Sequence, residues 1–236
     1  MQTWCSKIRD VRGASCYAGR MPARVVGVVL GSRLVVFVLA WLSFGCLLGQ
    51  FYGLWTMHLF GCWVLPPATV LLGLAAYWNR ERPPGPESPR TWIVQGALGG
   101  VVAAIAYDLY RLPFVLNGAP LFMVFPRFGE LLLGVNEPRW LVHGLGWTYH
   151  FSNCAALGIM FLVMASCFRR PMLFWGAVAW AVFVEAMLLL TPYASFFGLK
   201  MNGRFLFLTA SAHVVFGMAL GLYCRTKLRW PVTSAD

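Results

Sequence analysis

Charged residues are scarce in this chain of 236 residues. Asp, Glu, Lys and Arg make up 11% of it, hydrophobic residues make up 59%, and the mean hydropathy is +0.67. This composition leaves no long polar stretch that could form a soluble domain beside membrane segments. We therefore expect an all-α polytopic membrane protein in which one membrane domain is the whole fold.

Acidic residues are scarcer than basic ones, with eight Asp and Glu against 19 Lys and Arg and a formal net charge of +11. A basic balance of this size can indicate nucleic-acid binding. Here, however, the basic residues are dispersed over several gaps between apolar stretches, which membrane orientation explains without a partner. We expect no nucleic acid among the partners.

Paired cysteine motifs are also missing. The seven cysteines include no Cys-x-x-Cys pair and none in a predicted outer loop. A disulfide framework or a redox relay is therefore not expected, and the thiols are interpreted as reduced, small apolar residues. They are Cys5, Cys16, Cys46, Cys62, Cys154, Cys167 and Cys224.

Long apolar stretches, in contrast, are abundant in this chain. A helix needs about 20 mostly apolar residues to cross a bilayer, because its backbone polar groups must be satisfied within the segment. Six stretches meet this length: 34–54, 57–78, 92–110, 140–167, 172–195 and 205–224. We expect a basic cytoplasmic segment at 1–33, a six-helix membrane domain at 34–224 and a short basic cytoplasmic tail at 225–236.

The basic residues alternate between the two sides of these six helices. Five of the 19 fall in the gaps on one side: Arg111, Arg127, Arg139, Lys200 and Arg204. The rest fall on the side of the two termini, and cytoplasmic loops carry the excess of Lys and Arg. The sequence therefore predicts a multi-pass protein of the inner (plasma) membrane with both termini in the cytoplasm.

The longest connection between predicted helices, 112–139, is unusually apolar for a loop. Pro126 suits the first turn of a short helix, on which Arg127 and Glu130 would form an ion pair. We expect an interfacial or re-entrant helix in this connection. Two roles remain open, a surface anchor and a lid over a cavity that opens outward.

Small residues spaced four apart mark faces on which membrane helices pack closely. Three predicted helices carry such stripes: Gly45, Gly49 and Gly53; Gly96, Gly100 and Ala104; Gly217 and Gly221. Continuing two of the stripes by four residues reaches Asp108 and His213. Both side chains are therefore expected to point into the bundle.

A candidate site follows from the remaining polar residues of the helices. His143, His150 and Asn153 are predicted to share one face of the 140–167 helix. At a rise of about 1.5 Å per residue, His150, Glu185 and His213 reach one level in the outer half of the bundle. Ionisable residues inside a membrane usually face its interior and have a partner, so we expect Glu185 to pair with His150 or His213.

Asp108 and His143 are expected above this level, nearer the outer surface. Arg111 is one turn beyond Asp108, and the two residues are predicted to form a local ion pair at the interface. We interpret Glu185, His150, His213 and Asp108 as candidate catalytic residues. His143, Asn153 and Arg111 are candidate ligand-binding residues.

Several chemistries fit this cluster. Glu185 with the two imidazoles could exchange protons, as acid and base on a lipophilic substrate or as a coupling relay. His150, His213 and Glu185 could instead bind a divalent metal, although the short ligand spacing typical of metal motifs is missing. Bis-histidine ligation of one haem is conceivable but not expected, and interhelical hydrogen bonds alone would be a packing role.

Residues 150–153 and 211–217 resemble the His/Asn and late-helix histidine segments of rhomboid intramembrane proteases. The Gly-x-Ser-Gly nucleophile motif of that family does not occur in the chain, so we claim no family. The sequence favours acid-base or metal-assisted chemistry on a small or lipophilic ligand. The alternatives are a proton-coupled transporter of a small solute and a non-catalytic subunit or assembly factor with a membrane-protein partner.

Overall fold

The computed structural model describes residues 27–134, 136–166, 168 and 172–228. The predicted basic segment lies mostly outside this part, as do most of the basic tail and the predicted positions of Cys5, Cys16 and Cys167. The described helices are α3 (Arg33–Phe51), α4 (Met57–Trp63), α5 (Leu65–Trp78), α6 (Pro89–Leu116), α7 (Val124–Leu133), α8 (Arg139–Ala165), α9 (Met172–Leu189), α10 (Tyr193–Phe196) and α11 (Gly203–Lys227).

The prediction of six membrane spans is confirmed, because six helical segments are long and apolar enough to cross a bilayer. The second span, Met57–Trp78, is divided into α4 and α5 at Val64. Pro66 and Pro67 occupy the first turn of α5, where their missing N–H groups interrupt the hydrogen bonding of a continuous helix. Helix α6 is longer than predicted at both ends, since it runs from Pro89 to Leu116 and contains Pro113.

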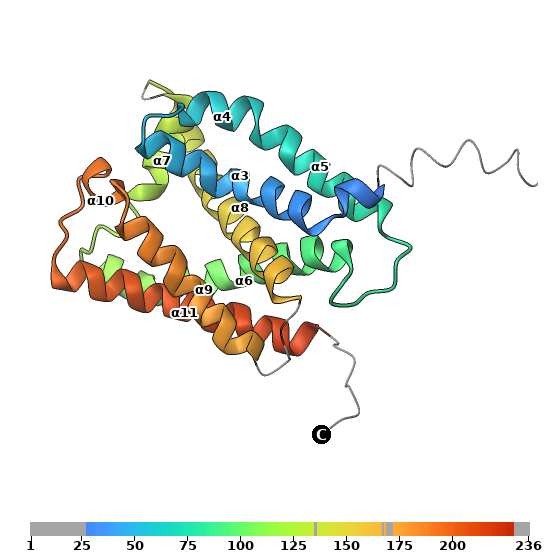
Figure 1. Ribbon diagram of the computed structural model, residues 1–236. Helices are drawn as coiled ribbons and strands as arrows, with labels where there is room; N and C mark the ends of the chain where they lie inside the picture. Colours follow the sequence, from blue (N-terminus) through green and yellow to red (C-terminus); the bar gives the residue numbers. More distant parts are fainter. Residues whose placement is uncertain (1–26, 135, 167, 169–171, 229–236) are drawn as a thin grey trace, which may run out of the picture.

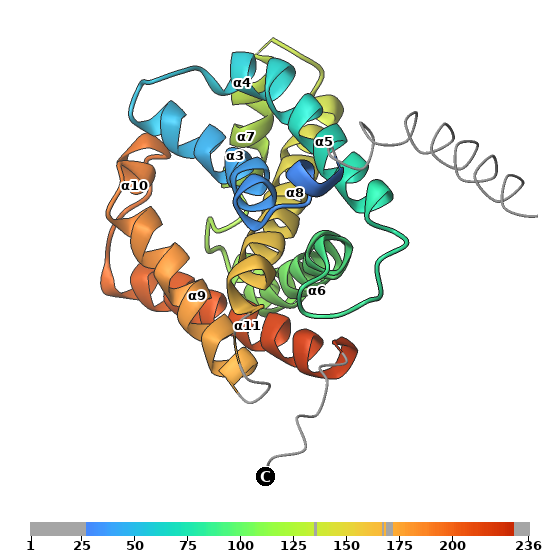
Figure 2. The same cartoon turned by 45° about the vertical axis from the view of Figure 1, so that its right-hand side comes forward.

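The spans form one bundle (Figure 1). The described chain begins and ends at the same end of this bundle, on the right in Figure 1, and α7 and α10 lie at the other end. Figure 2 shows α8 between α3 on one side and α6 and α11 on the other. Helix α8 is the most enclosed span, with 67% of its most apolar window buried, whereas the corresponding value for the α4–α5 span is 11%.

Glycine contacts hold α6 against α8. A Cβ atom on Gly96 would lie 2.6 Å from the Ile159 Cα, and one on Gly100 would meet the Cys154 carbonyl. The contact is reciprocal, because a Cβ on Gly158 would meet the Gly96 carbonyl. The predicted small-residue stripe of this helix is therefore a close backbone contact, and it fixes where α6 places Asp108.

Helix α11 packs in the same way on α9. Added Cβ atoms at Gly217 and Gly221 would lie 2.6 and 2.8 Å from the Val178 and Phe174 Cα atoms. The small-residue stripe predicted for the first span is only partly confirmed. Gly45 and Gly49 are buried, but Gly53 is exposed beyond the end of α3 with φ +66°, because it turns the chain toward α4.

The apolar connection between α6 and α8 contains helix α7, in which Arg127 Nη1 donates to Glu130 Oε2 at 2.7 Å, as the spacing predicted. The opposite face of α7 packs tightly on α8. A Cβ on Gly129 would meet the Val142 carbonyl, and one on Gly146 would meet the Phe125 carbonyl. Such backbone contact makes α7 a fixed part of the bundle wall.

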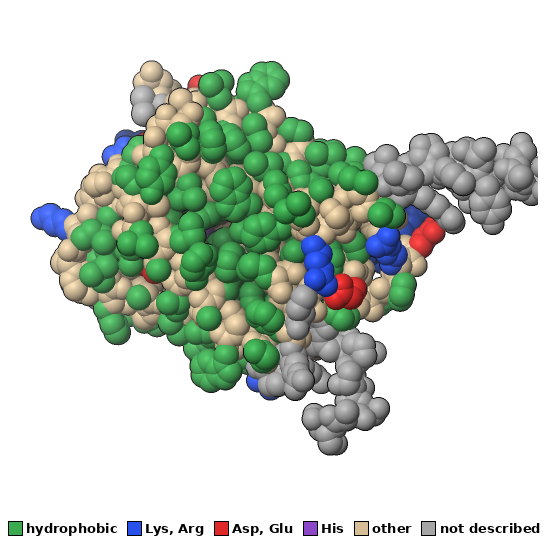
Figure 3. Space-filling model, in the orientation of Figure 1, with side chains coloured by type: hydrophobic (Ala, Val, Ile, Leu, Met, Phe, Trp, Pro, Cys, Tyr) green, Lys and Arg blue, Asp and Glu red, His purple; other side chains and the backbone are tan. Residues whose placement is uncertain are grey.

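The distribution of side chains on the surface suits a protein that is surrounded by lipid. Figure 3 shows hydrophobic side chains over the middle of one face, with Lys, Arg, Asp and Glu mainly toward the two ends. Trp63, Trp140 and Trp175 are at least 70% exposed, which suits contact with lipid or its interface. Within the described residues Cys46, Cys62, Cys154 and Cys224 are free thiols.

Candidate functional site

Two pairs of histidine and carboxylate join four helices inside the bundle. His150 Nε2 of α8 lies 2.9 Å from Asp108 Oδ2 of α6, and His213 Nδ1 of α11 lies 3.0 Å from Glu185 Oε2 of α9. The four side chains are between 7% and 14% exposed. Glu185 thus pairs with one of the two histidines expected for it, whereas the pairing of His150 with Asp108 was not predicted.

The hydrogen bonds of His213 define its tautomer. Its Nδ1 lies 3.0 Å from the Glu185 carboxylate and 2.9 Å from the Thr209 carbonyl oxygen. Both partners are acceptors, so Nδ1 must carry a proton and donate it. In the neutral ring Nε2 is then a free acceptor, and within the described residues it has no hydrogen-bond partner. A carboxylate that holds Nδ1–H in this way leaves Nε2 oriented as a base.

His150 uses both of its ring nitrogens. Nε2 faces Asp108, while the Cys154 Sγ lies 3.9 Å from Nδ1 and can donate its S–H to it. The ring also packs against Phe125, with ring centroids 4.4 Å apart. His150 is thus held by Asp108, Cys154 and Phe125, and it is less able than His213 to exchange a proton with a ligand.

Arg111 is buried in the same region, with 5% of its surface exposed. Its guanidinium donates to the Leu121 carbonyl and lies 3.6 Å from Asp108 Oδ1 and 4.6 Å from the centre of the Tyr107 ring. The predicted ion pair with Asp108 is present. Its expected place at the exposed interface is wrong, because α6 continues to Leu116 and the following connection folds over the arginine.

These side chains, except Asp108, line one cavity of about 90 Å³. Polar lining residues come from five elements and include Arg111, His150, Asn153, Glu185, Tyr193 and His213. The rest of the wall is mainly apolar and includes Phe44 and Leu47 of α3. The connection between α6 and α8 closes one side of the cavity through Leu121, Phe125 and Phe128.

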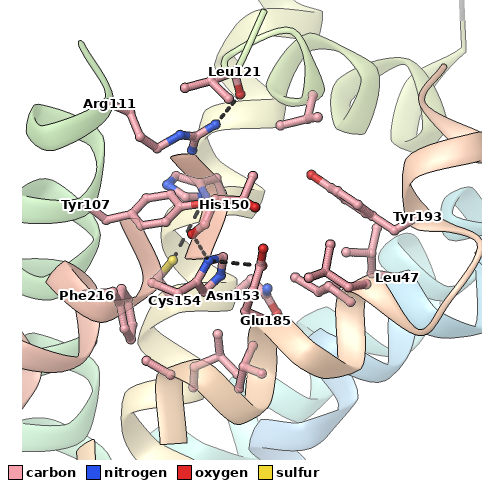
Figure 4. A pocket seen from close by; sticks show the side chains of 18 of the residues that line it. Leu47, Tyr107, Arg111, Leu121, His150, Asn153, Cys154, Glu185, Tyr193 and Phe216 are labelled. Carbon is pink, nitrogen blue, oxygen red and sulfur yellow. Dashed lines mark hydrogen bonds and ion pairs between the residues drawn. The ribbon is translucent and has the colours of Figure 1, made fainter. Parts of the chain in front are cut away.

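Figure 4 shows the arrangement from close by. Tyr107, Arg111 and His150 lie together on one side of the cavity, Glu185 points toward its middle and Tyr193 lies opposite. Tyr107 lies beside both histidines, since its ring centroid is 6.3 Å from that of His150 and 5.1 Å from that of His213. The two pairs therefore share Tyr107 as a neighbour.

Several buried polar atoms at the cavity have no hydrogen-bond partner within the described residues. Three of them are Asn153 Oδ1, Trp180 Nε1 and Glu185 Oε1, and all three residues line the cavity. Leaving a buried polar group unpaired costs about 1–3 kcal/mol. A bound molecule that both donates and accepts hydrogen bonds would satisfy these atoms.

Tyr193 adds a neutral hydroxyl to the opposite wall. Burial raises the pKa of Tyr193 to about 12, an effect that Arg111 opposes and Glu185 reinforces. The phenol therefore stays protonated at neutral pH and can donate a hydrogen bond. Its ring packs edge-on against Phe51 and Phe197, which holds α10 beside the end of α3.

The structure does not bring every predicted site residue to this cavity. His143 is exposed on α8 and is not among the lining residues, although His150 is. In the parts of the chain that the structure describes, no group of three or more His, Cys, Asp or Glu side chains is placed to hold a metal ion. The proposed metal set of His150, His213 and Glu185 thus contains one close pair, His213 and Glu185, and stays a prediction.

The two histidines of the haem alternative, His150 and His213, both line the cavity, and each is paired with a carboxylate. Sequence reasoning missed Tyr107, Cys154, Trp180 and Tyr193. Helical spacing could have found Cys154, which follows His150 by one turn. Tyr193 lies beyond the end of α9, where no helical pattern indicates which way a side chain points.

In comparisons with protein-family models, curated proteins and solved structures, no match to this chain was found. The site is therefore interpreted from its own geometry. That geometry combines a partly apolar cavity, a histidine with one free ring nitrogen and a buried carboxylate with one free oxygen.

Proposed function

We propose that this multi-pass membrane protein binds a small or lipophilic ligand in the cavity and exchanges a proton with it. The observation that carries this proposal is the pairing of Glu185 with His213. Because Nδ1 of His213 donates to the Glu185 carboxylate and to Thr209, its Nε2 is available to accept a proton. The carboxylate stabilises the imidazolium that forms.

The other residues have supporting roles in this proposal. Glu185 Oε1 and Asn153 Oδ1 accept hydrogen bonds from the ligand, and Trp180 Nε1 and the Tyr193 hydroxyl donate to it. Asp108 and Arg111 hold His150 and the cavity wall in place. The apolar lining suits a ligand that enters from the lipid or carries an apolar group.

We also propose that the termini lie in the cytoplasm and that the protein belongs to an inner (plasma) membrane. The excess of basic residues on the side of the termini supports this orientation. In this orientation the 112–139 connection and α7 lie at the outer face. They form an interfacial element that closes the cavity, in keeping with the close contacts between α7 and α8.

The proposal is tested by identifying small molecules that copurify with the protein. Wild type, Glu185→Gln and His213→Ala are purified in detergent, and their organic extracts are compared by mass spectrometry. Glu130→Gln is the matched control, because Glu130 is a glutamate on the α7 surface, outside the cavity. We expect a compound that wild type and the control retain and that the two cavity variants lose at least about tenfold.

An identical extract from all four proteins would contradict ligand binding in the cavity. If a compound is found, proteoliposomes containing a pH-sensitive dye distinguish the two uses of the proton. Conversion of the compound without proton flux indicates an enzyme, and flux coupled to its uptake indicates a transporter. Metal analysis of wild type and His150→Ala tests the metal alternative, which a stoichiometric metal lost in the variant would support.

A further inference from the structure

A second hollow, of about 510 Å³, lies at the other end of the bundle from α7. It is bounded by the connection between α5 and α6, by the first turns of α6 and by the end of α11. The proposed proton chemistry makes no use of it. Its residues have a chemistry of their own, which is cationic.

Three cations line this hollow: Arg82, Arg90 and Lys227. All three are exposed, and none has a carboxylate partner within the described residues. Among the described residues, Arg90 makes one long hydrogen bond of 3.5 Å, to the Arg80 carbonyl. Of the two glutamates in the connection, Glu87 is paired with Arg33, and neither Glu81 nor Glu87 lines the hollow. The positive charge is therefore available to a bound anion.

The first turn of α6 adds backbone donors. This helix of 28 residues begins at Pro89, and the N–H groups of its first turn have no acceptor within the helix. They carry the positive end of the helix dipole, which favours anions such as phosphate. Gly85 N donates to the Thr91 Oγ1, which keeps the connection folded over this turn.

Ser88 provides an independent indication of a ligand. It is the residue before α6, but its side chain does not cap the helix. The residue is 5% exposed, its Oγ has no hydrogen-bond partner within the described residues, and it lines the hollow. A hydroxyl buried beside three cations and a helix N-terminus can donate to an anionic oxygen.

We infer that this hollow binds a phosphate group. The phosphate would accept from the Ser88 hydroxyl and the N–H groups of Arg90 and Thr91, while Arg90 and Lys227 neutralise its charge. It can belong to the head group of an anionic phospholipid or to a free phosphate. The position of the hollow at one end of the apolar band suits a head group, because lipid phosphates lie at that depth.

The test uses the full chain in detergent and native mass spectrometry with two lipids, phosphatidylglycerol and phosphatidylcholine. Wild type is expected to bind one phosphatidylglycerol molecule more tightly than it binds further phosphatidylglycerol or any phosphatidylcholine. The variant Arg90→Gln/Lys227→Gln should weaken that binding at least about tenfold, since each basic residue near an anionic lipid contributes about fivefold. Ser88→Ala should weaken it by about threefold. Arg204→Gln removes a cation at the other end of the bundle and should leave binding within twofold.

Inorganic phosphate is the second probe, with thermal unfolding as the readout. If the site takes free phosphate, phosphate will raise the Tm of wild type but not of the double variant, and the phosphatidylglycerol affinities of the two proteins will be alike. The inference is overturned if neither probe separates wild type from the double variant, or if Arg204→Gln weakens binding equally. The substituted cations are exposed, so circular dichroism should show unchanged helix content.

Discussion

At the scale of single residues, the role of each polar group in the site depends on its hydrogen-bond and ion-pair partners. Asp108 and Glu185 carry the same charge in the same bundle but differ in their surroundings. Each carboxylate pairs with a histidine and has a second oxygen without a hydrogen bond within the described residues, but Asp108 Oδ1 lies 3.6 Å from the Arg111 guanidinium, whereas Glu185 lines the cavity. Glu185 is therefore the carboxylate expected to meet the ligand, because it lines the cavity and Asp108 is not among the lining residues.

His150 and His143 offer a matched comparison on one helix. His150→Ala should lower the free energy of unfolding by about 1–3 kcal/mol, because it leaves the buried Asp108 without its closest partner. His143→Ala should change it by less than about 0.5 kcal/mol, because His143 is exposed. Thermal unfolding in detergent measures both. Equal effects of the two substitutions would contradict the assignment of His150 to the interior.

The Glu185–His213 pair can be tested by a double-mutant cycle. His213→Leu leaves a carboxylate that is 7% exposed without its partner and should destabilise the protein by about 3 kcal/mol or more. Glu185→Leu/His213→Leu should be less destabilised than the sum of the single variants, by about 1–3 kcal/mol. Denaturant or thermal unfolding of the four proteins gives this coupling energy. Additive effects would mean that the pair does not form.

At the scale of helices, the small-residue stripes place the polar residues. Four-residue spacing predicted that Gly96 and Gly100 form a packing face and that Asp108 follows on the same face. Both expectations agree with the contact between α6 and α8. The partner helix could not be predicted, because periodicity gives the direction of a face but does not say which helix lies opposite.

Gly158 and Gly144 test this packing on a single helix. A Cβ on Gly158 would meet the backbone of α6, whereas one on Gly144 would have nothing within 4 Å. Gly158→Ala should therefore destabilise the protein by about 1–3 kcal/mol through overpacking. Gly144→Ala should be neutral or slightly stabilising, because alanine favours the helix more than glycine does. A loss of stability with Gly144→Ala alone would contradict this account.

Irregular segments explain most of what sequence reasoning missed. The break between α4 and α5 depends on two prolines that the hydropathy of the span conceals. The burial of Arg111 depends on the connection that follows α6, whose Leu121 carbonyl accepts from the guanidinium. Such contacts join residues without a repeating pattern, so the sequence could not predict the Leu121 partner of Arg111 or the pairing of His150 with Asp108.

At the scale of the whole molecule, the bundle has two chemically different ends. The cavity and α7 lie toward one end, and the end at which the described chain begins and finishes carries the hollow lined by Arg82, Arg90 and Lys227. The charge distribution predicts that this second end faces the cytoplasm. The cavity would then lie nearer the outer face.

Orientation is tested with single cysteines in a variant that lacks the native ones. A cysteine at Glu87 should react with a membrane-impermeant maleimide only after the cells are permeabilised. A cysteine at Lys200 should react in intact cells, because it lies in a connection at the other end of the bundle. Labelling with the reverse pattern would show that the termini face outward.

The most direct test of the proposed chemistry is the protonation of His213 itself. Nitrogen-15 NMR of histidine-labelled protein in detergent or lipid, with the His213 signals assigned from their loss in His213→Ala, distinguishes its two ring nitrogens. The account predicts, for the neutral ring, a protonated Nδ1 and an unprotonated Nε2 whose signal shifts when a cavity ligand binds. A proton on Nε2 with Nδ1 bare would contradict it, because the Glu185 and Thr209 oxygens could not then hold the ring as a base.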